Sequence, residues 1–170
     1  MDLGQQLLWL LARVFYGKIN DFWAFKEFLV ISSFVLDGDN YMEINKELLD
    51  GLTAQAKESP RLRMNLDLRN SAEDGSQRML NAIEPESQVP IHRHKKTSET
   101  VVVLRGRVVE EYYSDEGVCE ASYEVSPAGP IYALNIPAGK WHTLSSLESG
   151  TVILEMKDGA FEPIGPDDIM

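Results

Sequence analysis

The sequence predicts an all-β protein, a small sandwich or barrel of short strands preceded by one helix. From about residue 77 onward, short segments of strand-forming residues alternate with turn signals such as RGR, SDEG and PAGK. No helical periodicity separates these segments, which argues against a parallel α/β fold. The chain has 170 residues, enough for one domain with a proper core. The predicted strands are 77–84, 88–94, 99–105, 107–113, 118–125, 131–136, 141–147 and 151–157.

Residues 1–41 form an aromatic-rich extension that holds nine of the fifteen aromatic residues. Three readings of it stay open: amphipathic helices that pack on the rest of the chain or on a second copy, contact with a membrane surface, or residues that precede a natural start at Met42. Its three basic residues against five acidic ones disfavour a membrane surface. Charged residues interrupt every apolar run, so none reaches the about 18 residues of a membrane span.

Residues 42–76 are predicted to hold a helix followed by a polar segment that contains arginines. Asn45 is a suitable N-cap for a helix that continues to Lys57, and Pro60 closes it. We place the barrel at residues 77–163 and a tail at 164–170. The apolar residues at helical spacing are Leu48, Leu49, Leu52 and Ala56.

The net charge of −11 disfavours nucleic acid and anionic membranes as partners. A small molecule is the expected partner. Cys119 is the only cysteine, which excludes an internal disulfide and suits a reducing cytoplasm.

The three histidines fall in a pattern that indicates a metal site. His92 and His94 would lie on the same face of a strand, because side chains alternate. A short turn brings Glu99 back alongside, and His142 begins another strand after the turn Pro137–Gly139. Neutral imidazoles are ligands for divalent transition metals, so we predict one such ion, which could be manganese, zinc, nickel or iron. The set leaves a coordination position open for water or substrate.

These residues resemble the two motifs of the cupin superfamily. The first, G-x5-H-x-H-x3,4-E-x6-G, is matched except at its opening glycine, and the second, G-x5-P-x-G-x2-H-x3-N, has Ser146 in place of its final asparagine. The resemblance implies a small β-barrel of jelly-roll type with the metal inside, and a homodimer. The matching residues are His92, His94, Glu99, Gly106, Pro137, Gly139 and His142.

A closer resemblance covers about residues 42–163. The stretches SPRLRMN, SQRMLNAIEP and LEMKDGAFEP, together with the HxH segment, look like the WbuC family of cupin-fold metalloproteins. Members of this bacterial family are found among genes for O-antigen and other surface polysaccharides. The resemblance implies a carbohydrate as the small-molecule partner, and it does not extend to residues 1–41.

Candidate substrate-binding residues come from three places. Arg61 and Arg63 would share a face if the segment is extended, and arginine forks bind carboxylates and phosphates; the alternative is a solvated loop. One of Gln77 and Arg78 must point into the barrel, and Arg78 is a further candidate for the site. Tyr132 and Trp141 could stack on a sugar or could be plain core residues.

Glu155 is the candidate catalytic residue. It lies on the same side of the last strand as Lys157, and the two could be an acid–base pair in the cavity or a solvent-facing ion pair. The acidic run Glu110–Glu111 is interpreted as solvated.

Three functions remain open at this point. The first is a metal-dependent isomerase, epimerase or lyase that acts on a sugar or sugar-nucleotide intermediate of surface polysaccharide synthesis. The second is a metal-bearing module that binds or senses a carbohydrate without turnover. The third is a non-heme iron oxygenase.

Overall fold

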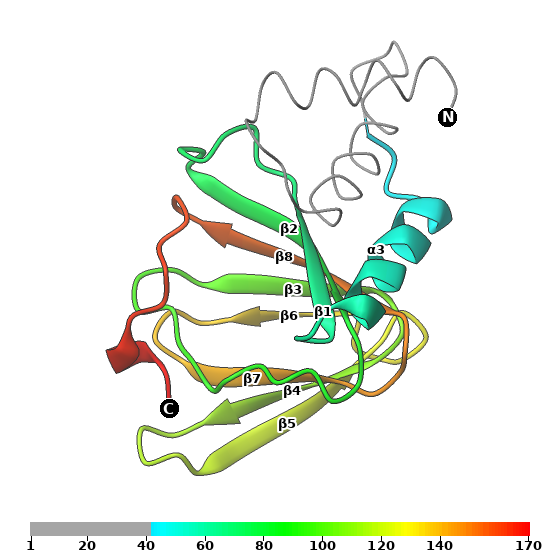
Figure 1. Cartoon of the computed structure of the whole chain (residues 1–170). Helices are drawn as coiled ribbons and strands as arrows, with labels where there is room; N and C mark the ends of the chain where they lie inside the picture. Colours follow the sequence, from blue (N-terminus) through cyan, green and yellow to red (C-terminus); the bar gives the residue numbers. More distant parts are fainter. Residues whose placement is uncertain (1–41) are drawn as a thin grey trace, which may run out of the picture. The chain divides into compact units, whose positions relative to one another are not determined.

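A computed structural model describes residues 42–170 of the chain, and the predictions for residues 1–41 lie outside it. Figure 1 shows the helix that precedes the strands lying beside them, and the strands pair in an antiparallel manner. The elements are α3 (Lys46–Glu58), β1 (Arg63–Asp67), β2 (Ser76–Ile83), β3 (Glu99–Arg105), β4 (Val108–Tyr113), β5 (Cys119–Val125), β6 (Ala133–Ile136), β7 (Trp141–Ser146), β8 (Thr151–Asp158) and the 3-10 turn η1 (Pro166–Asp168).

Helix α3 begins where its cap predicts. The Asn45 side chain accepts a hydrogen bond from the backbone N–H of Leu48 at 3.0 Å, which satisfies one free donor of the first turn. The apolar face packs against β1 and β2, and the helix ends at Glu58, one residue beyond the prediction. Within residues 42–170 no helix has the length and apolarity that a membrane crossing requires. The residues that α3 buries are Leu48, Leu49, Leu52, Thr53 and Ala56.

The strands form two antiparallel sheets. One has five strands in the order β1-β2-β8-β3-β6, and the other has three in the order β5-β4-β7. Strands β3 and β4 follow each other through a tight turn at Gly106 and yet lie in different sheets. Neighbours in each sheet are therefore mostly distant in sequence, as in a jelly roll. The predicted all-β fold, a small cupin-type barrel with a helix before it, is confirmed.

The barrel interior is apolar at one end and polar at the other. Register pairs Val103 with Ile153 in the apolar half. Four residues further along β8, Lys157 pairs with Gln77 of β2 on one side and with Glu99 of β3 on the other. Because inward-facing positions alternate along each strand, these polar side chains belong to the same inner face as the apolar ones. The buried apolar cluster consists of Ile83, Val101, Val103, Val108, Val125, Ile136, Leu144 and Ile153.

Two strand predictions need correction. Segment 88–94 is not a strand, because Pro90 has no N–H to donate to a ladder. Within this segment only His92 is bridged to a strand, through His142 of β7. The segment interpreted as a polar loop contains β1, which pairs with β2 from Arg63 opposite Ile83 to Asp67 opposite Met79.

The last residues of the chain also lie along the segment around His92. Ile169 forms a bridge with His92 on the side away from β7. The backbone N–H of Met170 donates to the Ile91 carbonyl at 2.9 Å, and that of Arg93 donates to the Asp168 carbonyl at 3.1 Å. The Arg93 side chain donates to Asp168 Oδ1 at 2.9 Å. The histidine-bearing segment is thus held between β7 and the chain's last residues.

Candidate metal centre and its cavity

Four metal-ligating side chains meet at the polar end of the barrel. His92 and His94 come from the segment beside β7, Glu99 is the first residue of β3, and His142 is the second residue of β7. One ligand atom from each lies within 4.8 Å of the others. Each of the two sheets contributes at least one of these side chains, so the barrel fold assembles the cluster.

Backbone carbonyls orient two of the imidazoles. The Nδ1 atom of His92 lies 3.0 Å from the Pro90 carbonyl, and that of His142 lies 2.9 Å from the Lys140 carbonyl. A carbonyl oxygen can only accept, so each Nδ1 carries the proton. In the neutral ring Nε2 then keeps its lone pair for a metal, the usual arrangement of ligating histidines.

The surroundings of His92 and Glu99 favour the ligating protonation states of these two residues. Burial, helped by the neighbouring His142, lowers the pKa of His92 to about 4, so this ring is neutral near pH 7. Burial alone would raise the pKa of Glu99, but the imidazoles of His142 and His94 hold it below its usual range. Neutral imidazoles and an ionised carboxylate are the forms that bind a divalent ion.

Glu99 supplies the observation that tests whether a metal fits. Its Oε2 atom lies 2.9 Å from His94 Nε2 and 3.6 Å from His142 Nε2. This oxygen is buried, and neither of these two contacts has the geometry of a hydrogen bond. A buried carboxylate oxygen without a partner is costly, and a cation between the four ligand atoms would supply one. The cluster fits a divalent metal site.

The cluster opens onto a cavity of about 310 Å³. Glu155 lies in this cavity, and its Oε2 accepts a hydrogen bond from the Asn81 side chain at 2.5 Å. Burial and the nearby charge of Glu99 raise the pKa of Glu155. Lys157 also lines the cavity. Of the two readings for Glu155 and Lys157, the structure therefore gives the cavity position and not the solvent-facing pair.

The two arginines of the polar segment separate. Leu62 has a φ of +54°, so the backbone is not extended between them and Arg61 does not share a face with Arg63. Arg63 lines the cavity and donates to the Gln88 carbonyl at 2.8 Å. Arg61 is exposed and lies outside the cavity lining.

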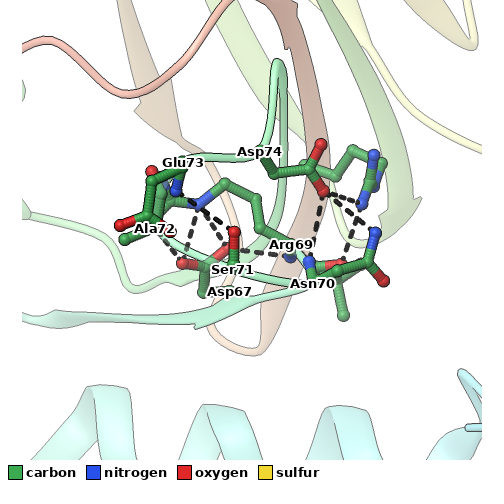
Figure 2. A network of polar contacts seen from close by, with 9 residues as sticks. Asp67, Arg69, Asn70, Ser71, Ala72, Glu73 and Asp74 are labelled. Atoms are coloured by element: carbon green, nitrogen blue, oxygen red, sulfur yellow. Dashed lines mark hydrogen bonds and ion pairs between the residues drawn. The ribbon is translucent and has the colours of Figure 1, made fainter.

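Three other candidates for substrate contact also lie away from the cavity. Arg78 donates to Asp74 at 2.9 Å, whereas Gln77 points inward. Figure 2 shows Asp74 within the polar network of the loop before β2. Tyr132 is 61% exposed. Trp141 is buried, donates from Nε1 to Asp115 at 2.9 Å, and lies under the Arg93 guanidinium at 4.2 Å.

Glu110 is a cavity residue that the sequence interpretation missed. It is only 1% exposed, so the reading of Glu110–Glu111 as a solvated run is wrong for Glu110. The available signal was strand alternation: an inward Val108 places Glu110 and Tyr112 on the same face. Its Oε1 atom is buried without a hydrogen-bond partner.

The stability of the metal-free protein is expected to fall as pH rises through the neutral range. Burial, with the charges of Glu99 and Glu155, raises the pKa of Glu110 to about 9 from its ordinary 4.5. Between these values the folded state holds a proton that the unfolded state has lost, so the free energy of unfolding decreases with rising pH. From about pH 7 to about pH 8.5 Glu110 alone would remove about 2 kcal/mol.

Urea unfolding of chelator-treated protein at these two pH values measures this effect. His92 is neutral in the folded and unfolded states over most of this range, so it contributes little. Glu110→Gln, which has no proton to lose, should flatten the dependence, leaving a smaller slope from Glu155. The control is Glu111→Gln on the opposite face of β4. An equal slope in Glu110→Gln and the unaltered protein would contradict the assignment.

Comparison with known proteins agrees with the fold. A family model described as "Domain of unknown function (DUF6016)" matches residues 44–125. No curated protein matches the chain in sequence. The capsular polysaccharide assembling protein CapF from Staphylococcus aureus is similar in structure, with a TM-score of 0.50 and 21% identity. That match covers 58% of this chain and 29% of CapF, so this chain corresponds to well under half of that protein.

Two further solved structures are less similar. KdgF from a Halomonas species has a TM-score of 0.48 and 13% identity, over 61% of this chain and 84% of that one. The cupin domain of Cnp3 from Schizosaccharomyces pombe has a TM-score of 0.45 and 11% identity, over 58% of this chain and 65% of that one.

Proposed function

We propose that this chain is a cupin-fold metalloenzyme of the WbuC type that acts on a sugar or sugar-nucleotide intermediate of bacterial surface polysaccharide synthesis. The reaction would be an isomerisation, epimerisation or elimination. The observation that carries the proposal is the convergence of three imidazoles and Glu99 at a cavity that also holds Glu155. The description of CapF as a capsular polysaccharide assembling protein supports the sugar class of substrate.

We assign metal binding and proton transfer to different residues of the cavity. His92, His94, Glu99 and His142 would hold one divalent ion of manganese, zinc, nickel or iron. When bound, the ion would polarise a substrate carbonyl or hydroxyl oxygen. Glu155, with its raised pKa and its hydrogen bond from Asn81, is the group proposed to give and take the proton at carbon.

Deuterium exchange tests the reaction class directly. Isomerases and epimerases that work by proton transfer label a carbon of their substrate in D2O, which proton NMR detects in a panel of sugar phosphates and nucleotide sugars. We expect Glu155→Gln to retain its metal and to lower the exchange rate at least about 100-fold. Glu162→Gln, an exposed acid of the cavity wall, is the matched control.

Two outcomes would redirect the proposal. Absence of exchange with every member of the panel, in metal-loaded protein that still binds one of them, would favour a binding or sensing module. Oxygen consumption by iron-loaded protein would favour an oxygenase.

We also propose that the protein acts in the cytoplasm and forms a homodimer. Light scattering on the purified full chain measures the oligomeric state.

A further inference from the structure

The cavity contains a buried carboxyl group that the proposed metal centre and proton transfer do not use. Glu110 extends from β4 into the cavity. It is 1% exposed, and its Oε1 has no hydrogen-bond partner. It is not one of the four clustered metal-ligating residues. A buried polar atom without a partner costs about 1–3 kcal/mol, so the fold keeps Glu110 at the expense of stability.

A second unpartnered acceptor faces the same cavity from the other sheet. Gln77 of β2 is 7% exposed, and its Oε1 likewise lacks a partner. It lies in the inward row that contains Lys157 and Glu99. Glu110 pairs with Leu144 of β7, and Tyr112, two residues further along β4, pairs with His142. Glu110 is therefore the next inward-facing residue of β4 after the one opposite His142. The two free acceptors therefore lie on opposite walls, each close along its sheet to a proposed ligand.

Cavity size and the need for hydrogen-bond donors limit what could satisfy these two atoms. A cavity of about 310 Å³ is at the lower end of the roughly 300–1,000 Å³ range of ligand pockets, which suits a single sugar ring. Its wall combines these acceptors with apolar surface from Met79, Val101 and Leu144. Both unpartnered atoms are oxygen acceptors, so each requires a hydrogen-bond donor from the ligand. The hydroxyl groups of a sugar ring supply such donors.

We propose that Glu110 and Gln77 form a hydroxyl-binding subsite, which holds a ring-sized sugar unit of the substrate next to the metal centre. The inference rests on the proposed function for its substrate and adds the part of the substrate that enters the cavity. Hydroxyl groups of the ring donate to the two free oxygens, and its apolar face contacts the apolar wall.

The test measures stability and sugar binding on the same variants of the full chain, loaded with zinc. Glu110→Met replaces the carboxyl group by an apolar side chain of similar length, and Glu110→Gln keeps a polar group of the same shape. Glu111→Met changes the neighbouring residue on the outer face of β4. Saturation-transfer NMR with N-acetyl-D-glucosamine, D-galactose and L-rhamnose reports binding, and thermal unfolding without sugar reports stability.

We expect Glu110→Met to raise the unfolding temperature, because an unsatisfied buried group is removed, and to weaken sugar binding at least tenfold. Glu111→Met should do neither, and all variants should keep their zinc. A lowered unfolding temperature in Glu110→Met, binding equal to that of the unaltered protein, or no binding of any of the three sugars to the unaltered protein would each overturn the subsite. Sugar binding without turnover would contradict the proposed enzyme and leave the subsite intact.

Discussion

Substituting His92 and His142 together by alanine is expected to remove bound metal completely. These are the two imidazoles whose Nδ1 atoms are fixed by backbone carbonyls, so their Nε2 atoms need the least reorganisation to bind an ion. Their loss leaves His94 and Glu99, too few ligands to retain a transition metal through purification. Elemental analysis by mass spectrometry, on untagged protein purified without chelators, measures the metal content.

The same double variant should remain folded. The apolar cluster between the sheets contains none of the four ligands, so the barrel keeps its core without them. Glu155→Gln, a change in the same cavity outside the ligand set, should keep its metal and serves as the control. Retention of metal by the double variant would contradict the assigned ligands, and its unfolding would indicate a structural ion. If the unaltered protein contains manganese, zinc or nickel, isomerase activity is tested next. If it contains iron, oxygen consumption is tested instead.

Replacement of Gly106 by alanine is expected to destabilise the barrel strongly. Gly106 has a φ of +80°, and a Cβ built on it would lie 2.2 Å from Thr151 Oγ1 and 2.8 Å from Thr151 Cα. Thr151 is fully buried and its Oγ1 donates to the Glu148 carbonyl at 2.7 Å, so neither chain can move aside cheaply. Strain and overpacking together should lower the free energy of unfolding by about 3 kcal/mol or more.

Gly139→Ala separates the two causes of that loss. Gly139 has nearly the same φ, +79°, but a Cβ there meets no atom within 4 Å. Its loss should be only the about 1–2 kcal/mol of a left-handed alanine. Urea unfolding of the two variants, at matched metal content, makes the comparison. Equal losses in both would show that the close approach to Thr151 relaxes freely.

The metal cluster could be predicted because its signal is local. His92, His94 and Glu99 are fixed by spacing along one short stretch, and His142 follows a turn that only a few residues define. The helix after Asn45 and most strands were predictable for the same reason, because caps, turns and alternation act over a few residues.

The cavity wall beyond the metal cluster depends on pairing between distant strands. Arg61 and Arg63 could not be told apart without the left-handed backbone at Leu62. Glu110 looked solvated beside Glu111, because one step in register decides which of two adjacent acids turns inward. The segment around His92 has the composition of a strand but only one paired residue, since Pro90 interrupts the ladder.

That single paired residue ties the metal centre to the chain's last residues. His92 is bridged to His142 on one side and to Ile169 on the other, and Asp168 and Met170 exchange hydrogen bonds with the residues next to it. An ion that fixes His92 therefore also favours the docked position of these residues, and by thermodynamic linkage their docking favours the ion to the same degree. Amide hydrogen exchange at Arg93 and Met170, whose N–H groups form two of these bonds, then reports metal occupancy from outside the cavity.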